Sequence, residues 1–194
     1  MKRLQIVTNI TATTFTTTTT NNNKIMPAKK LLILNSQQIQ QKLDRIAYQV
    51  LEDNFDEQEI MIAGILPRGN LVAKRIKTIL DGIAPFKSRL LTIELDKEST
   101  TLKANTDFDV QDCKDKVVII VDDVLNSGKT LAYGLGIFLN VPLKKIRSVV
   151  LVDRNHKSFP VTTDYSGMAL STVIKDHVDV VLDKANEPDA VYLV

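Results

Sequence analysis

The sequence predicts an α/β domain built on a doubly wound, mainly parallel β-sheet. Apolar runs of strand length alternate with segments of helical periodicity, the order expected when parallel strands are joined by crossover helices. The runs 60–66 and 117–121 are apolar without interruption, which is typical of strands buried on both faces. A chain of 194 residues fits one domain, alone or with a tail, and an apolar content of 44% suffices for a core.

The first helix has both a start signal and an apolar face. It follows a short apolar run, Lys30–Leu34. Asn35 is a good N-cap residue, and Gln38 stands three positions later as its capping-box partner. The apolar positions that follow share one face of a helix. They are Ile39, Leu43, Ile46, Val50 and Leu51.

Strands and helices then alternate. The strand Ile60–Leu66 ends at Pro67-Arg68-Gly69, and a helix continues to about Leu80. Arg89–Leu95 is the next strand. The segment Asp96–Asp115 is polar and charged with no clear period, and a loop of that length in a compact domain is usually functional or mobile.

The second half repeats the alternation with shorter elements. Lys116–Val121 is the strongest predicted strand, Ser127–Leu139 a helix, and Ile146–Val152 a further strand. Val178–Leu182 and Ala190–Val194 close the chain as short strands. The side chains of the predicted helix that should face inward are Leu131, Leu135, Phe138 and Leu139.

Residues 1–25 differ from the rest of the chain. A run of threonines, 16–20, is followed by three asparagines, 21–23. Such a polar tract cannot offset its ordering entropy, so a disordered extension is expected before a domain spanning 26–194. The tract lacks the apolar centre of a secretory signal, but its basic, acid-free composition leaves a transit peptide open. An upstream stretch read from an early start is also open, with Met26 as the alternative first residue.

Charge and composition exclude some classes of protein. The formal net charge is +2, but residues 1–25 hold three basic residues and no acid, which leaves 22 basic and 23 acidic residues in 26–194. A strongly basic nucleic-acid binder is therefore not expected, and any RNA surface would be a local patch. No apolar run approaches 18 residues, so no membrane span is expected. The single cysteine, Cys113, predicted to lie in a loop, fits a reduced, cytoplasmic setting.

The segment 117–130 is the main candidate site. A buried strand delivers two adjacent carboxylates, Asp122 and Asp123, and the short loop Asn126–Thr130 then opens a helix. Backbone N–H groups at such a turn bind anions, and Gly128 allows close approach to a phosphate. Ser127 and Thr130 add hydroxyl donors. Carboxylates repel phosphate but accept hydrogen bonds from sugar hydroxyls, so the pair and the loop together suit a ribose 5-phosphate.

A P-loop nucleotide triphosphatase is the rival interpretation, because Gly128-Lys129-Thr130 resembles the end of a Walker A motif. That motif requires a glycine five positions before Gly128, where this chain has Asp123. A carboxylate there would face the triphosphate, which disfavours this class.

The segment resembles the phosphoribosyl-pyrophosphate signature of type I phosphoribosyltransferases: four apolar residues, two acids, two apolar residues and a short Ser/Thr-Gly-x-Thr loop. The resemblance implies that Asp122 and Asp123 hold the ribose hydroxyls and that the loop wraps the 5-phosphate. It also implies a small C-terminal hood and magnesium bound through phosphoribosyl pyrophosphate (PRPP) rather than directly by the protein. The loop residues are Asn126, Ser127, Gly128, Lys129 and Thr130.

Two further segments fit the same resemblance. Pro67-Arg68-Gly69 looks like the family's pyrophosphate loop, with Arg68 facing the diphosphate. The polar stretch Asp96–Asp109 falls where the family has a loop that closes over the reacting centre and excludes water.

The second half is similar to one branch, the pyrimidine operon attenuation regulator with uracil phosphoribosyltransferase activity. The similar segment begins Leu151-Val152-Asp153-Arg154-Asn155-His156-Lys157, and the resemblance runs from about Leu34 to Val194. It implies that Val152, Asp153, Arg154 and Leu170 border the base. His156 and His177 are interpreted as ordinary surface or loop-bracing residues.

The chain departs from that branch at three places. Asn126 stands where the branch has an aromatic residue and purine enzymes have an acid, so a 6-oxopurine substrate is disfavoured. The loop sequence Asp96-Lys97-Glu98-Ser99 lacks the branch's arginine, for which Lys97 or Lys103 could substitute only as a point charge. Ser171-Thr172-Val173-Ile174 replaces a Thr-Ser-Arg-Ser segment.

Two functions are therefore expected from the sequence. The first is transfer of ribose 5-phosphate from PRPP to a nucleobase, with uracil favoured, by a homodimer or higher homo-oligomer. The alternative is a nucleotide-sensing, RNA-binding regulator of pyrimidine genes with weak or no catalysis. RNA binding requires a basic surface, which is disfavoured by the net charge. The candidate cations are Lys74, Arg75 and Lys77; Lys87 and Arg89; and Lys144, Lys145 and Arg147.

Overall fold

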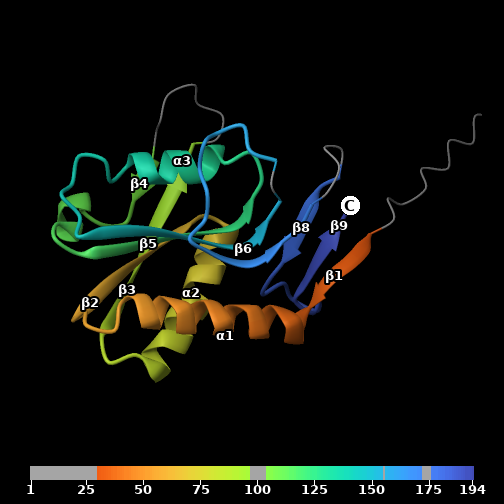
Figure 1. Cartoon of the computed structure of the whole chain (residues 1–194). Coiled ribbons are helices and arrows are strands. Elements are labelled where there is room, and N and C mark those ends of the chain that lie inside the picture. The colour runs from red at the N-terminus through yellow and green to blue at the C-terminus, as the bar shows by residue number, and fades with distance from the viewer. Residues whose placement is uncertain (1–29, 97–103, 155, 172–175) are drawn as a thin grey trace, which may run out of the picture.

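The computed structural model describes residues 30–96, 104–154, 156–171 and 176–194 (Figure 1). The helices are α1 (Ser36–Asp53), α2 (Arg68–Ile83) and α3 (Lys129–Gly136), with a 3-10 turn η1 (Val110–Cys113). The strands are β1 (Leu31–Asn35), β2 (Glu59–Ile65), β3 (Lys87–Leu95), β4 (Ala104–Thr106), β5 (Val117–Leu125), β6 (Lys145–Asp153), β7 (Tyr165–Ala169), β8 (Val178–Val181) and β9 (Ala190–Leu193).

The central sheet is parallel except at one edge, which confirms the predicted fold class. Its strand order is β4-β3-β2-β5-β6-β7, and only β4 runs antiparallel to its neighbour. Figure 1 shows α1 and α2 on one face of the sheet and α3 on the other. Because the strands of a parallel sheet end at the same edge, ligands bind there, beyond their carboxyl ends.

The two faces of the sheet divide the core by strand periodicity. On β5, Val117, Ile119 and Val121 pack toward α1 and α2, whereas Val118 and Ile120 pack toward α3. All five side chains are fully buried. An apolar strand buried on both faces therefore carries the acidic residues that follow it into the site.

Helix α1 begins and packs as its sequence predicts. The Asn35 side chain accepts a hydrogen bond from the Gln38 N–H at 2.9 Å, and Gln38 Oε1 accepts one from the Asn35 N–H at 2.9 Å. This reciprocal pair is the predicted capping box. The buried residues of the helix lie on the predicted face. They are Ile39, Leu43, Ile46, Ala47 and Val50.

A second, three-stranded antiparallel sheet forms the hood, in the order β1-β9-β8. The predicted hood was C-terminal, but its edge strand β1 comes from the start of the described chain. Leu31 pairs with Leu193, and Asn35 pairs with Ala190. The first apolar run therefore belongs to the hood rather than to the parallel sheet.

Three predicted boundaries require correction. Strand β5 continues past Val121 to Leu125, because β6 pairs with it as far as Asp153 after the pairing with β2 has ended. Helix α3 covers only Lys129–Gly136 of the predicted 127–139. The chain then turns, so Phe138 is buried but Leu139, predicted to face inward, is 82% exposed.

Strand β4 and the turn η1 lie inside the predicted loop 96–115, and strand β7 lies where no element was predicted. β7 contains Gly167, and an added Cβ there would lie 2.4 Å from the Leu151 carbonyl oxygen. The backbones of β6 and β7 therefore lie close together at this glycine, and β7 has no apolar periodicity by which it could be predicted. β4 pairs with β3 inside the predicted long loop. Cys113 is buried at the end of η1, where desolvation raises the pKa of its thiol.

No helix within the described residues combines the length and the apolar character that a membrane crossing requires. The predicted extension, residues 1–25, lies outside the described residues, as do residues 97–103, Asn155 and residues 172–175.

An ion-pair cluster joins α1 to β6 and β7 at the end of the sheet where β6 and β7 begin. Asp53 Oδ2 accepts a hydrogen bond from the Tyr165 hydroxyl at 2.7 Å and lies 3.0 Å from Lys145 Nζ and 3.1 Å from Arg147 Nε. Partial burial alone would raise the pKa of Asp53, but these hydrogen bonds outweigh it and lower the pKa to about 2. The same contact and burial raise the pKa of Tyr165.

The lowered pKa of Asp53 predicts an acid-dependent stability. The contribution of Asp53 to the free energy of unfolding is present above the unfolded-state pKa of about 4 and is lost as pH falls toward 2. Asp53→Asn should therefore lower the free energy of unfolding by roughly 0.5–1 kcal/mol at neutral pH, a small value because solvent screens the pair. The deficit should shrink below pH 3, as measured by urea unfolding across pH 2–7. Asp44→Asn on the same helix is the control, and an unchanged deficit at pH 2 would contradict this role.

Candidate active site

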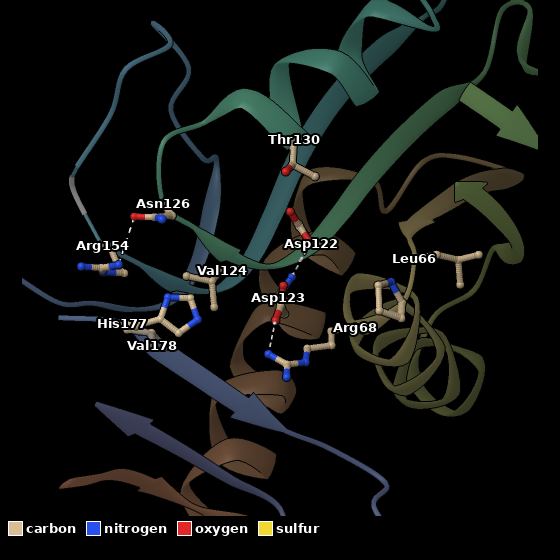
Figure 2. Close-up of a pocket in the computed structure, with 11 residues that line it drawn as sticks. Leu66, Arg68, Asp122, Asp123, Val124, Asn126, Thr130, Arg154, His177 and Val178 are labelled. Carbon is tan, nitrogen blue, oxygen red and sulfur yellow. Dashed lines mark hydrogen bonds and ion pairs between the residues drawn. The ribbon is translucent and has the colours of Figure 1, made fainter. Parts of the chain in front are cut away.

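An open pocket of about 340 Å³ lies between the carboxyl ends of β2, β5 and β6 and the hood strand β8 (Figure 2). It brings together two predicted segments that lie more than fifty residues apart in the chain. The lining residues are Leu66, Pro67, Arg68, Asp122, Asp123, Val124, Asn126, Thr130, Arg154, His177 and Val178.

The two carboxylates stand on the last part of β5. Asp122 is 8% exposed, and its Oδ1 accepts a hydrogen bond from the Asp123 N–H at 2.9 Å. The side chain of Asp123 is 17% exposed, and Asp123 Oδ2 lies 3.9 Å from Arg68 NH1. Both line the pocket, so the strand presents two adjacent acceptors to a ligand there.

The loop after β5 forms a smaller hollow of about 130 Å³ with the start of α3. The Ser127 carbonyl oxygen accepts hydrogen bonds from the N–H groups of Ser158 and Phe159 at 2.8 and 3.0 Å. The Lys129 N–H donates to Ser127 Oγ at 3.3 Å. Gly128 has φ 83°, which turns the chain into α3. The loop is thereby fixed at a helix N-terminus, which favours anions.

Lys129 is the predicted loop residue that lies outside both of these hollows. Its ammonium stands 5.4 Å from the centre of the Tyr133 ring, and it borders a separate hollow with Leu95 and Asp96. The backbone N–H of Lys129 still belongs to the loop, whereas its side chain points toward the segment that precedes residues 97–103.

Gly128 is predicted to tolerate no Cβ. Alanine at φ 83° is strained, and its Cβ would lie 2.6 Å from Val161 Cγ2. Gly128→Ala should therefore lower the free energy of unfolding by about 2–3 kcal/mol, as measured by urea denaturation. In a Val161→Ala background, the added cost should fall to about 1 kcal/mol, because only the backbone strain remains. An equal cost in both backgrounds would contradict the contact.

The segment Pro67-Arg68-Gly69 is not a free loop but the start of α2. Pro67 is the N-cap residue, after a cis Leu66–Pro67 peptide bond, and Arg68 and Gly69 are the first residues of the helix. A Cβ on Gly69 would lie 2.6 Å from the Val121 carbonyl oxygen and 2.7 Å from Asp122 Cα. Gly69 therefore lets the helix start against the backbone of β5, which brings Arg68 to the acid pair.

The four residues predicted to border the base lie around the end of β6 in different environments. Val152 is fully buried in the core, and Arg154 is 3% exposed but lines the pocket. Asp153 ends β6 with its side chain 3.5 Å from Lys157 Nζ. The Leu170 N–H donates to the Asp153 carbonyl oxygen at 2.7 Å. Of the four, Arg154 has its side chain in the pocket lining.

Acceptors that help to hold Arg154 in place include two groups of the described residues. Its guanidinium donates to Asn126 Oδ1 at 3.1 Å and to the Asp176 carbonyl oxygen at 2.6 Å. The first bond is drawn in Figure 2, where the Asn126 amide points toward Arg154 rather than toward the acid pair. Asn126 is thus fixed by a buried cation, and it can offer no proton acceptor stronger than an amide oxygen.

Sequence reasoning missed the hood's side of the pocket. His177 and Val178 line it, and Figure 2 shows the His177 ring beside Val178, on the side of Val124 and Arg154. The backbones of His177 and Val194 exchange two hydrogen bonds at 2.8 Å, which fix the start of β8. The sequence contains the predicted strand at 178–182, but no local signal says that its first residues return over the parallel sheet.

The metal-binding potential of the site rests on oxygen atoms. Among the described residues, no group of three or more His, Cys, Asp or Glu side chains is arranged to hold a metal. Asp122 and Asp123 nevertheless both contribute carboxylates to the pocket lining, and carboxylate oxygens suit Mg²⁺. These donors fit an ion that also takes ligands from a bound phosphate compound.

Comparison with known proteins agrees with this geometry. Residues 32–185 match the phosphoribosyl transferase domain. A bifunctional protein PyrR from Staphylococcus aureus is 34% identical over 171 residues, covering 84% of this chain and 97% of its own. A bifunctional protein PyrR from Fusobacterium nucleatum is 30% identical over 174 residues, covering 86% and 98%.

Solved structures agree on the fold. A hypoxanthine-guanine phosphoribosyltransferase from Bacillus anthracis superposes with a TM-score of 0.68 at 22% identity, covering 85% of this chain and 97% of its own. The hypoxanthine phosphoribosyltransferase of Trypanosoma cruzi gives 0.66 at 16% identity, covering 84% and 94%. The sequence relatives bear out the branch that the sequence resembles, and the chain belongs to the phosphoribosyl transferase domain family.

Proposed function

We propose that this chain transfers ribose 5-phosphate from PRPP to uracil and releases pyrophosphate. The observation that supports it is the convergence in one pocket of the acid pair of β5, Arg68 at the start of α2, and Asn126 and Thr130 at the two ends of the loop, whose Ser127 and Gly128 line the adjoining hollow. The three parts offer acceptors for sugar hydroxyls, an anion cradle and a guanidinium around adjoining hollows.

Each part has one task in the proposed reaction. Asp122 and Asp123 accept hydrogen bonds from the ribose 2- and 3-hydroxyls, which orients the anomeric carbon. The N–H and hydroxyl groups of Ser127, Gly128 and Thr130 hold the 5-phosphate. Arg68 faces the leaving diphosphate and offsets the charge that develops on it as the bond to the anomeric carbon breaks. Together they convert a bimolecular displacement into one between positioned groups.

Magnesium enters the proposal as a companion of PRPP. Asp122 and Asp123 are the residues that would lie beside it. The ion supplies neutralisation of the diphosphate charge when it is bound. The protein's own groups still bind and orient the ribose, which is why the acid pair is the feature to test.

Uracil is favoured over 6-oxopurines by the residue at position 126. Asn126 stands where purine enzymes of the family have an acid, and the bond from Arg154 holds its amide oxygen at 3.1 Å. No side chain is assigned as general base, because an amide cannot take a proton from the base. The curated relatives are named bifunctional protein PyrR, whereas the solved neighbours include hypoxanthine-guanine enzymes. Of the four residues that the resemblance implies border the base, we propose that Arg154 does so with its side chain and that Val152, Asp153 and Leu170 surround the end of β6 beside it.

The test measures pyrophosphate release with PRPP, magnesium and each of uracil, hypoxanthine, guanine, adenine, xanthine and orotate. Release that depends on uracil and is lost in Asp123→Asn is the expected result. Release with another base alone would reassign the substrate. If no base supports release, UMP should still raise the melting temperature, and its failure to do so would exclude a nucleotide pocket.

An RNA-binding regulator is the second candidate, favoured by the resemblance to the attenuation-regulator branch to which the sequence relatives point. Ion pairs weigh against it, because most of the candidate cations already face carboxylates. Arg75 pairs with Asp183 and Asp189, and Lys77 with Asp81. Lys144, Lys145 and Arg147 pair with Glu57, Asp53 and Asp164. RNA binding is therefore expected to be weak, and a salt-dependent, sequence-specific gel shift of a pyrimidine-leader RNA would contradict this.

The family resemblance is also the basis for proposing a cytoplasmic homodimer or larger homo-oligomer. Light scattering after size exclusion, with and without PRPP, measures the mass that decides between a monomer and these assemblies.

A further inference from the structure

The hood contributes a carboxylate to the cation that faces the diphosphate. Asp179 lies on β8, and its Oδ1 accepts a hydrogen bond from Arg68 NH2 at 3.0 Å. The other carboxylate oxygen, Oδ2, lies 3.3 Å from Lys30 Nζ. One acidic side chain of the hood therefore joins the first residue of α2 to the residue that precedes β1.

Strand periodicity brings Asp179 to this position. Val178 and Val180 of β8 are buried, so the side chain between them points to the opposite face of the strand. Arg68 borders both the main pocket and a second hollow of about 400 Å³ that is lined by Asp179 and the residues after it. The guanidinium thus stands at the boundary between the sheet's acid pair and the hood.

Both terminal nitrogens of Arg68 face carboxylates. NH1 lies 3.9 Å from Asp123 Oδ2, and NH2 lies 3.0 Å from Asp179 Oδ1. A guanidinium binds phosphate groups best through two parallel N–H bonds from one edge of its fork. The Arg68 N–H groups on the side of Asp179 already donate to the hood. A diphosphate that approaches them would be repelled by the negative charge of the Asp179 carboxylate.

We propose that Asp179 competes with the diphosphate for Arg68 and thereby sets the affinity of the site for PRPP and pyrophosphate. The inference rests on the proposed function, because it takes Arg68 as the diphosphate ligand. Binding of the diphosphate replaces the Arg68–Asp179 pair, and Asp179 Oδ2 keeps Lys30 as its partner. A nucleoside monophosphate has no group at this position, so its affinity is independent of Asp179.

The test compares the Kd values of pyrophosphate, PRPP and UMP by calorimetry in magnesium buffer, using the full chain and its Asp179→Asn variant. Asparagine keeps the shape of the side chain and one acceptor but removes the charge. We expect the Kd values of pyrophosphate and PRPP to fall roughly two- to fivefold, which is the scale of a partly exposed ion pair, and that of UMP to stay the same. Under steady-state conditions the KM for PRPP should fall while kcat changes little.

Glu187→Gln is the matched control, since it removes one negative charge from the hood hairpin at a residue that pairs with Lys184 at 2.6 Å. An equal fall in both variants would overturn the inference in favour of a general charge effect. An unchanged Kd for pyrophosphate in Asp179→Asn would overturn it because Asp179 would not compete for Arg68, and a higher Kd would overturn it because Asp179 would then be orienting Arg68. If neither protein binds PRPP, pyrophosphate or UMP, the proposed function fails as well, whereas equal binding by both proteins removes the inference alone.

Discussion

Asp123→Asn should lower kcat/KM for PRPP about 100-fold. The variant keeps the size of the side chain but replaces a charged acceptor by a neutral one, and a hydrogen bond to a charged group contributes about 1.5–3 kcal/mol. Since about 1.4 kcal/mol corresponds to a factor of ten, the loss spans roughly 10- to 150-fold. Initial rates of pyrophosphate release measure it. If turnover of the parent protein is too slow to follow, the Kd of UMP is the equivalent measurement.

The side chain of Asp123 is partly exposed and lies 3.9 Å from Arg68, so the variant should keep its melting temperature within a few degrees. Asp56→Asn, at an exposed carboxylate in the turn after α1, is the matched control and should leave both activity and stability unchanged. If Asp123→Asn retained full kcat/KM in a folded protein, Asp123 would not be a ribose ligand.

Gly69→Ala should destabilise the protein and abolish the site, although alanine is the better helix former. In an unconstrained helix the change would gain up to about 1 kcal/mol. Here the new Cβ would lie 2.6 Å from the Val121 carbonyl oxygen and 2.7 Å from Asp122 Cα, and neither backbone atom can move without displacing β5. We expect a loss of about 2–3 kcal/mol in urea unfolding, the scale of an overpacked core.

The loss of function should exceed what the loss of stability explains. Moving the start of α2 away from β5 separates Arg68 from the acid pair, so activity should fall at temperatures where the variant remains folded. Gly82→Ala is the matched control, since this glycine lies in the same helix and an added Cβ there meets no atom within 4 Å. That variant should be neutral or slightly stabilised. Equal effects at the two glycines would contradict a role for close helix–strand approach.

Much of the fold was predictable because its signals are local. The capping box of α1 needs only Asn35 and Gln38, three residues apart, and both of its hydrogen bonds form. The uninterrupted apolar run of β5 indicates burial on both faces wherever the strand stands in the sheet. The acid pair and the glycine loop are contiguous in sequence, so their proximity is guaranteed by the chain itself.

The boundaries that were wrong depend on partners far away in sequence. β5 extends to Leu125 because β6 continues to pair with it, and β1 joins the hood because β9 lies beside it. β7 forms although Gly167 interrupts any apolar pattern, since the backbone of β6 approaches it closely. The alternation of apolar and polar residues shows which face of a strand is buried, but it does not show which other strand pairs with it.

Signals that span a few neighbouring residues were enough to predict the class of the fold and to place the acid pair beside the Ser-Gly-Lys-Thr loop, because strand burial, helix capping and these two segments are local features. The folded structure was needed to show which distant side chains meet around these segments. It brought Arg154 to Asn126, His177 to the pocket, and Asp179 to Arg68 across 111 positions of chain. The physical reason is that these contacts depend on how the hood folds over the sheet, and non-local pairing leaves no periodic or adjacent trace in the sequence.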